Sequence, residues 1–436
     1  MYGPAQSMQC WLSMKRLVCG AALVVALALP SPAPAYSVLA HEASIDVVWQ
    51  TGILPLLTRR FPRATPEDLV RARSFAYGGS VIQDLGYYPF GNKFFSNLLH
   101  YVRSGDFVEA LIHEAHDIDE YAFALGALAH YADDNVGHPE ATNRSVPIVF
   151  PKLRAKFGDT VTYVQSPKEH IIVEFSFDVV QAAGGRYLPD AYRSFIGFRV
   201  ASDVLRRAFR QTYGLEMSDL FGNEDRAIAT YRYAVSELIP TLTNAAWRDK
   251  HDEITRLLPG VERAGFVFVW RKSDFERSYG TNYQKPGLLA RFLGLLYRVL
   301  PKVGPLKPLA FKAPTLEVEE MFARSFRDAA ARYRAALADV ADNRFDFQNT
   351  DFDTGRAARH GEYPLADDTY AELVDRFRKR SLAGLPDALR ENILAFYGPR
   401  PASSAVAKRE RKHWKRLAGA LTELRDHARA GDRFDH

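Results

Sequence analysis

Residues 120–138 read "EYAFALGALAHYADDNVGH" and place His130, Asp134 and His138 at intervals of four at the end of an apolar run. The apolar residues recur at helical spacing. His130 and Asp134 stand at positions i and i+4, so both side chains leave the same face of a helix. Polar groups embedded in an apolar helix need partners, and a divalent cation is one such partner. The stretch therefore predicts a helix that carries metal ligands.

A second segment repeats the pattern in "KEHIIVEFSFD", residues 168–178, where Glu174 follows His170 by four positions. Two helices that each offer a histidine and a carboxylate one turn later can hold a divalent cation between them, and these ligands suit Zn²⁺. Either pair alone is more typical of a polar contact on a wet helix face. Seven of the 12 histidines fall between His41 and His170, and this clustering favours the metal.

The N-terminal residues have the pattern of a secretory signal peptide. Lys15 and Arg16 precede an apolar run from Leu17 to Leu29, and "PSPAPAYS" follows that run. We expect cleavage after Ala35, so that residues 1–35 form the signal peptide and the mature protein is secreted or periplasmic. An uncleaved membrane anchor is the alternative, and the apolar run is short for a membrane span.

The positions of the cysteines and the net charge limit the kinds of cross-link and partner that the mature protein can have. Cys10 and Cys19 both lie in the segment that we expect to be removed, so the mature chain has no thiol and no disulfide. Metal ions then replace disulfides as the expected cross-link, and a site without thiolates suits hydrolytic catalysis more than a structural role. Removing Lys15 and Arg16 lowers the formal charge from +5 to +3. So mild a charge argues against a polyanion-binding protein, and no nucleic-acid partner is expected.

Apolar periodicity predicts an all-α protein, because β-like alternation is scarce. Asp117 with Glu120 has the spacing of a capping box at the start of the helix quoted first. We divide the mature chain into a metal-binding domain, residues 36–185, and an additional helical region of unknown role, residues 186–436. Helices are expected over residues 40–60, 65–78, 92–103, 106–116, 118–136 and 167–183, and then around 191–212, 223–248, 316–342, 367–396 and 405–430. The last of these is basic and amphipathic, which suits either a solvated face or peripheral contact with a membrane.

The histidines and acids of residues 38–185 resemble, in their order, those of the zinc-dependent phospholipase C family, whose fold is shared with the single-strand-specific zinc nucleases. That family carries an early histidine, an isolated aspartate, another histidine, then His-x-x-x-Asp, a nearby histidine and finally His-x-x-x-Glu. The segments that match are "AHEASID", "GSVIQDLGYYPFG", "FFSNLLHYVRSGDF", "AHYADDNVGHP" and "KEHIIVEFSFD". Their matching residues are His41, Asp84, His100, His130, Asp134, His138, His170 and Glu174.

The resemblance implies an all-helical domain in which two or three Zn²⁺ ions line a cleft. The ligand sets that it implies are Asp84, His100, His130 and Asp134 for one ion, His138, His170 and Glu174 with a bridging Asp84 for another, and His41 with Asp134 for a third. Asp84 is the expected general base, or a ligand that orients the attacking water, and Glu174 is first of all a ligand. Asp133 is adjacent to Asp134 and is an alternative ligand.

Two further groups of residues are less specific. Five aromatic residues between Tyr87 and Phe95 follow Asp84 and suit either core packing or a greasy, stacking wall beside the metals. His113 and His116 lack the spacing of known zinc motifs, and we expect them on the surface or just outside the ligands.

These observations predict a secreted zinc-dependent phosphoesterase. The reaction that we expect is that of a phospholipase C, in which a metal-activated water hydrolyses a phospholipid to diacylglycerol and a phosphorylated head group. A nuclease or another phosphodiesterase on the same metal site is one alternative. A non-catalytic surface or lipid-binding protein, in which zinc only staples the helices, is another. Neither the head group nor the oligomeric state has a signal in the sequence.

Overall fold

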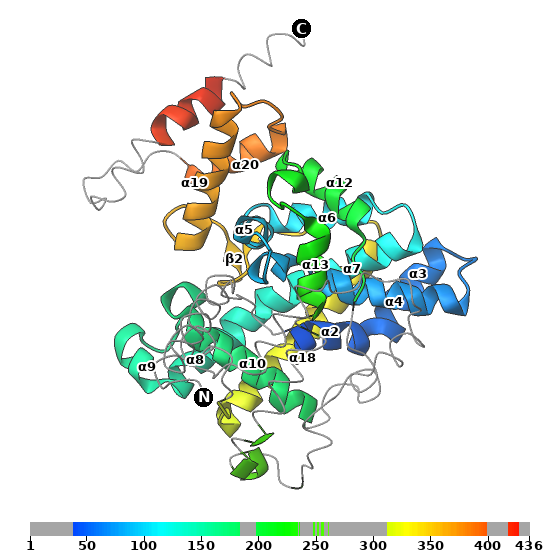
Figure 1. Cartoon of the computed structure of the whole chain (residues 1–436), viewed down its shortest axis with the longest axis vertical. Coiled ribbons are helices and arrows are strands. Elements are labelled where there is room, and N and C mark those ends of the chain that lie inside the picture. The colour runs from blue at the N-terminus through cyan, green and yellow to red at the C-terminus, as the bar shows by residue number, and fades with distance from the viewer. Residues whose placement is uncertain are drawn as a thin grey trace, which may run out of the picture.

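The computed structural model describes residues 38–183, 198–233, 312–398 and 417–426, with a few short pieces between 235 and 260 (Figure 1). The predicted signal peptide and both cysteines lie outside the described residues. The predicted helices around 191–212, 223–248 and 405–430 are described only in part.

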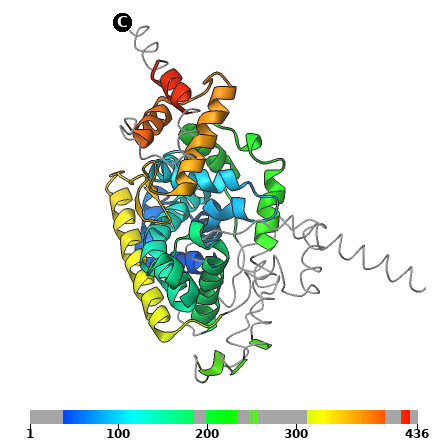
Figure 2. The same cartoon turned by 90° about the vertical axis from the view of Figure 1, so that its left-hand side faces the viewer.

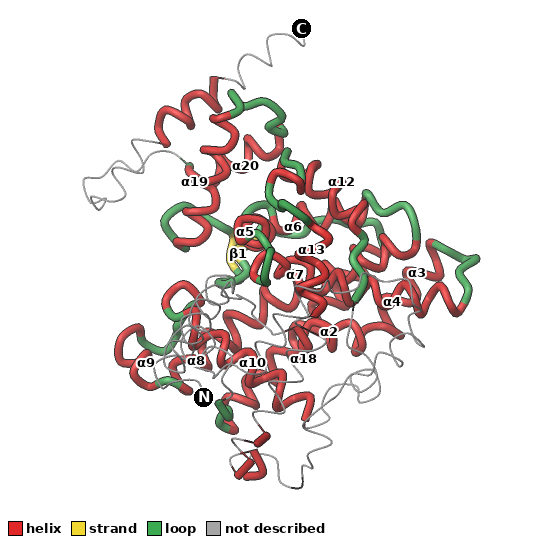
Figure 3. Tube along the Cα trace, viewed as in Figure 1, coloured by secondary structure: helices red, strands yellow, loops and turns green. Residues whose placement is uncertain are grey.

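The described chain is almost entirely helical, which confirms the predicted all-α class (Figure 3). Its α-helices are α2 (Val38–Val48), α3 (Leu54–Arg60), α4 (Pro66–Val81), α5 (Lys93–Tyr101), α6 (Ser104–His113), α7 (Ile118–Gly137), α8 (Asn143–Val149), α9 (Pro151–Phe157), α10 (Pro167–Ala183), α12 (Ser202–Tyr213), α13 (Glu224–Tyr233), α18 (Leu316–Ala341), α19 (Pro364–Lys379) and α20 (Asp387–Tyr397). Short 3-10 or π turns are η1 (Trp49–Ile53), η2 (Ile82–Tyr87), η3 (His138–Thr142), η4 (Tyr163–Gln165) and η5 (Met217–Asp219). A small antiparallel pair joins β1 (Thr350–Asp351) to β2 (Arg356–Ala357). Within the described residues, no helix has the length and apolar character that a membrane span requires.

Helix α7 begins at the predicted cap. The Asp117 carboxylate accepts hydrogen bonds of 2.9 Å from the backbone N–H groups of Asp119 and Glu120. The reciprocal half of the predicted capping box is displaced by one residue, because the Glu120 carboxylate accepts from the N–H of His116 at 2.8 Å instead of from Asp117. The cap nonetheless satisfies N–H groups that a helix start leaves without partners.

The prediction of a single helix over residues 367–396 is wrong, since residues 380–386 separate α19 from α20. Ser381 and Leu382 adopt positive φ angles of 53° and 63°, and a right-handed helix cannot continue through such residues. The N–H of Leu382 donates to the carbonyl of Phe377 at 2.9 Å, which closes the end of α19. Pro386 then precedes α20.

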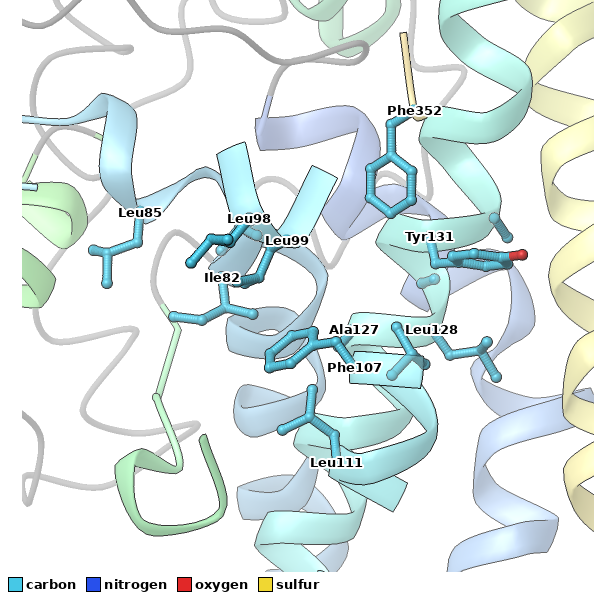
Figure 4. Packing of buried hydrophobic residues seen from close by; sticks show 14 of the residues in the cluster. Ile82, Leu85, Leu98, Leu99, Phe107, Leu111, Ala127, Leu128, Tyr131 and Phe352 are labelled. Atoms are coloured by element: carbon cyan, nitrogen blue, oxygen red, sulfur yellow. The ribbon is translucent and has the colours of Figure 1, made fainter. Parts of the chain in front are cut away.

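Helix α7 lies at the centre of the bundle, between α4 on one side and α18 on another. Figure 2 shows α18 as the long yellow helix along one flank, and the Tyr333 hydroxyl of α18 donates to the carbonyl of Leu125 at 2.8 Å. Figure 4 shows the apolar contacts around α7, which involve Leu98 and Leu99 of α5, Phe107 and Leu111 of α6, and Ala127, Leu128 and Tyr131 of α7 itself.

Helices α4 and α7 approach each other through glycine. A Cβ atom on Gly126 would lie 2.0 Å from the carbonyl oxygen of Ala76 and 3.0 Å from the Cα of Gly79. A Cβ atom on Gly79 would lie 1.9 Å from the carbonyl oxygen of Phe123. Such close backbone contact requires residues without a side chain. It also sets the distance between Ser80 at the end of α4 and His130 on α7, which becomes important in the metal centre.

We expect Gly126→Ala to lower the free energy of unfolding by about 2–3 kcal/mol, because the backbones must separate to admit a methyl group. Chemical denaturation with metal present measures this change. Gly419→Ala is the matched control, since Gly419 is also helical but no atom of the described residues lies within 4 Å of an added Cβ. The control should raise stability by up to about 1 kcal/mol through helix propensity. Equal effects at the two positions would contradict the close-contact argument.

Candidate metal centre

The structure brings all of the predicted ligand residues into one buried region. His41 comes from α2, Asp84 from η2 and His100 from the last turn of α5. The remaining residues come from the end of α7 and its junction with η3, and from α10. The complete set is His41, Asp84, His100, His130, Asp134, His138, His170 and Glu174, and each residue is at most 1% exposed.

Their ligand atoms form three groups, and within each group the atoms lie within 4.8 Å of one another. The groups are His41 with His130 and Asp134, Asp84 with His100 and His130, and His138 with His170 and Glu174. The groups differ from the implied sets in three respects: His130 belongs to both of the first two groups, Asp134 is grouped with His41 and not with Asp84 and His100, and Asp84 is not a member of the third. The third group contains the residues expected for the second ion except the bridging Asp84.

Asp134 joins the first two groups. Its Oδ1 lies 3.4 Å from Nε2 of His41, and its Oδ2 lies 3.1 Å from Nε2 of His130 and 3.5 Å from Nε2 of His100. Oδ1 of Asp84 approaches Nε2 of His100 at 3.4 Å. Burial disfavours a charge on His100, but Asp134 and Asp84 raise its pKa to about 10. His100, Asp84 and Asp134 together therefore favour the binding of a positive charge, either a proton or a metal ion.

Backbone carbonyls orient two of these histidines. Nδ1 of His100 lies 2.7 Å from the carbonyl of Ser96, and Nδ1 of His130 lies 2.9 Å from the carbonyl of Ser80. A carbonyl only accepts, so both Nδ1 atoms carry a hydrogen and donate it. In the neutral ring, the lone pair is then on Nε2, which faces the carboxylates. This arrangement is typical of histidines that bind metals.

Asp133 and Asp134, which the sequence did not separate, have different places. Oδ2 of Asp133 lies 3.2 Å from Nδ1 of His41, and its Oδ1 accepts a 2.9 Å hydrogen bond from the Ser44 hydroxyl. Asp133 thus holds the far side of the His41 ring, whereas Asp134 lies within the group. Asp178 contributes further, because it accepts 3.0 Å hydrogen bonds from the N–H groups of Leu39 and Ala40, at the start of the helix that carries His41.

In the third group, hydrogen bonds fix the tautomer of His170. The Asn143 amide donates from Nδ2 to the backbone carbonyl of Asp353 at 2.7 Å, which turns its Oδ1 toward Nε2 of His170 at 2.8 Å. His170 therefore donates from Nε2, and its Nδ1 faces Oε1 of Glu174 at 2.6 Å. Burial and the neighbouring His138 lower the pKa of His170 to about 3. Burial, with the charges of Asp134 and Asp84, raises the pKa of Glu174 well above its usual value. A divalent cation can replace the proton that these two groups share.

Many atoms of the centre are buried without a hydrogen bond. They are both carboxylate oxygens of Asp84 and of Asp134, Nε2 of His100 and of His130, both ring nitrogens of His138 and Oε2 of Glu174. Buried polar atoms in this state are costly, and the cost rises when they are charged. Imidazole nitrogens and carboxylate oxygens, without thiolates, are a donor set that suits a hydrolytic zinc site. The residues present therefore fit zinc.

Sequence reasoning missed Asn143 and Asp353, whose contacts reach the third group. Oδ1 of Asp353 lies 3.1 Å from Nε2 of His138. Asp353 comes from "NTDFDTG", residues 349–355, where two acids and a glycine are common features of an ordinary turn. The local sequence therefore contains no signal that separates Asp353 from a surface acid.

The less specific residues divide between core and surface. His113 and His116 are exposed, and the His113 ring lies 3.5 Å from Glu109. Tyr87 is buried with its ring centroid 5.6 Å from that of His100. Phe95 lies in the main hydrophobic core, which agrees with the first of the two roles considered for these aromatic residues.

A comparison with known protein families finds a match over the part of the chain that carries most of the ligand residues. Residues 48–223 match the family model described as zinc dependent phospholipase C. The match confirms the resemblance, begins after His41 and continues beyond residue 185 through α12. No curated protein and no solved structure matches the chain.

We expect His130→Ala and Glu174→Gln each to lower the zinc content of the purified protein, because each change removes a ligand from a group of three. Elemental analysis after dialysis measures the ions retained per chain. His113→Ala is the control, since its side chain is exposed and lies outside the three groups. Full zinc content in both ligand variants would contradict the assignment.

Proposed function

Because residues 48–223 belong to the zinc dependent phospholipase C family, we propose that this protein is a secreted zinc-dependent phosphoesterase that hydrolyses phospholipids. The proposed products are diacylglycerol and a phosphorylated head group. The proposed ligands are the eight residues of the three groups, which offer places for two or three ions.

The convergence of unpartnered ligand atoms carries this proposal. Residues from six separate helices or turns send their nitrogen and oxygen atoms to a single buried region, and most of those atoms have no hydrogen bond. Without a bound cation, these side chains would leave that cost uncompensated. Bound zinc ions would supply the missing positive charge and would lower the pKa of a water for attack on phosphorus.

The protein's own residues would orient the reaction. Asp84 follows α4 directly on the turn η2, and both of its carboxylate oxygens are free of hydrogen bonds. It can therefore accept a proton from the attacking water or help to hold an ion beside it. The carbonyls of Ser80 and Ser96 keep the rings of His130 and His100 from rotating. This preorganisation reduces the rearrangement that the reaction requires.

A small apolar cluster beside the metal centre supports a lipid substrate. It consists of Tyr87, Tyr163 and Ile171, with Tyr88 and Leu365 packed against it. The Tyr87 ring lies next to His100, and the Tyr163 centroid lies 5.8 Å from that of His170. The cluster therefore contacts histidines of two metal groups. An aromatic wall of this kind suits an acyl chain or a quaternary ammonium group.

Export is part of the proposal and rests on the sequence of residues 1–35. Zinc would then load onto a chain without cysteine, and the mature protein would meet phospholipid at a membrane surface. N-terminal sequencing of protein recovered outside the cytoplasm should begin at Tyr36.

Product analysis tests the reaction. The zinc-loaded protein should release a phosphorylated head group and diacylglycerol from phosphatidylcholine vesicles. Faster cleavage of single-stranded nucleic acid than of lipid would instead favour a nuclease. Full zinc occupancy without turnover of lipid, nucleic acid or a chromogenic phosphodiester would favour a protein that zinc only staples.

Asp84→Asn should lower kcat by about 100-fold or more even when zinc is added until the sites are full, because the amide cannot accept the proton. The measurement is the initial rate of head-group release together with zinc content. Asp159→Asn serves as the control, because the Asp159 side chain is 80% exposed and pairs only with Arg154 among the described residues. Unchanged kcat in Asp84→Asn would remove Asp84 from the reaction.

A further inference from the structure

The turn that contains β1 and β2, residues 350–357, lies against the metal centre although it is distant in sequence. The N–H of Phe352 donates to the carbonyl of His100 at 3.2 Å. The Phe352 ring is fully buried, with its centroid 5.2 Å from that of His100 and 5.7 Å from that of Tyr131. Figure 4 shows Phe352 next to Tyr131 at one end of the packed apolar residues. The turn therefore covers the histidines of the second group.

The next residue, Asp353, reaches the third group. Its side chain is buried, and Oδ1 lies 3.1 Å from Nε2 of His138. Oδ2 accepts a 2.8 Å hydrogen bond from the Tyr101 hydroxyl, so the carboxylate is held from its other side. The backbone carbonyl of Asp353 also accepts from Asn143, the residue that orients His170. One residue of the turn thus reaches His138 through its side chain and His170 through its backbone.

A comparison among the histidines indicates what Asp353 does. His100, His130 and His170 each have one ring nitrogen against an oxygen of a carbonyl or amide, and His41 has one against Asp133. For His138, the oxygen that the described residues place against a ring nitrogen is Oδ1 of Asp353, at 3.1 Å. Histidines that bind metals commonly donate their second N–H to a carboxylate or a carbonyl.

We propose that Asp353 is the positioning residue of His138: its Oδ1, which lies 3.1 Å from Nε2 but outside hydrogen-bond alignment, accepts the Nε2 hydrogen when the ring turns to present Nδ1 to the ion. Asp353 is not itself a member of the group formed by His138, His170 and Glu174. Its effect on the metal therefore passes through the orientation and basicity of the His138 ring. The inference rests on the proposed zinc site, and it extends that site to a residue beyond the family match over residues 48–223.

Zinc affinity of the full chain, measured by competition with a chromogenic chelator, tests this role. Asp353→Ala should weaken the zinc ion at the third group by about 10- to 100-fold, the range found when such orienting partners are removed. Asp351→Asn is the matched control on the same turn. Asp351 is equally buried, its carboxylate accepts from the N–H of Asp353 and the hydroxyl of Thr354, and asparagine retains an acceptor. The zinc affinity of Asp351→Asn should remain within about twofold of that of the unaltered protein, whereas Asp353→Ala should lose more.

A combination with His138→Ala separates positioning from direct ligation. If Asp353 acts through His138, adding Asp353→Ala to His138→Ala weakens zinc no further. An additional loss of similar size in the double variant would overturn the proposal, because Asp353 would then act on the metal independently.

Tyr101→Phe provides a second route if Asp353→Ala does not fold. This change keeps the ring and removes only the hydroxyl that holds Oδ2 of Asp353, so a smaller loss of zinc affinity is expected. The absorption spectrum of the cobalt-substituted protein should also change in Asp353→Ala and Tyr101→Phe but not in Asp351→Asn. Unchanged zinc affinity and cobalt spectra in both variants would refute the role. These readouts need no substrate, so they are independent of whether phospholipid is hydrolysed.

Discussion

Buried negative charge is the constraint on which the rest of this structure depends. Asp84 on η2, Asp134 in the last turn of α7 and Glu174 in the middle of α10 have nearly no access to water, and most of their oxygens have no hydrogen bond. Placing carboxylates in such an environment is costly unless cations neutralise them. The surrounding histidines are arranged to share that role with metal ions. Because the cost falls on side chains from widely separated segments, the centre and the helical bundle stabilise each other.

Precision at the centre comes largely from the backbone. The glycine contact between Gly79 and Gly126 sets the separation of α4 and α7, and it thereby places the carbonyl of Ser80 against Nδ1 of His130. The backbone at the start of α2 is also fixed in place, because the Asp178 carboxylate of α10 accepts hydrogen bonds from the N–H groups of Leu39 and Ala40. Rigid elements of this kind maintain ligand geometry better than loops do.

Features with a local cause were predictable from the sequence. The cap at Asp117 and the His-x-x-x-acid pairs on α7 and α10 depend on residues within one helical turn, so spacing alone predicted them. Helices α8 and α9 were not among the predicted helices; both contain proline, since Pro147 lies inside α8 and Pro151 begins α9. The choice of Asp134 over Asp133 depends on the position of His41, more than 90 residues away. Asp353 depends on contacts over still longer separations, which no local pattern contains.

The hydrogen bond between Tyr101 and Asp353 joins residues that are 252 positions apart. A ribosome delivers the chain from its N-terminus, so the helices that bear the histidines emerge long before the turn that covers them. Contacts of such separation are slow to form, because much of the intervening chain must be ordered first. The cover that residues 350–357 form over His100 therefore depends on the ordering of chain far from the ligands themselves. A substitution anywhere in that intervening chain can loosen the cover without touching a ligand.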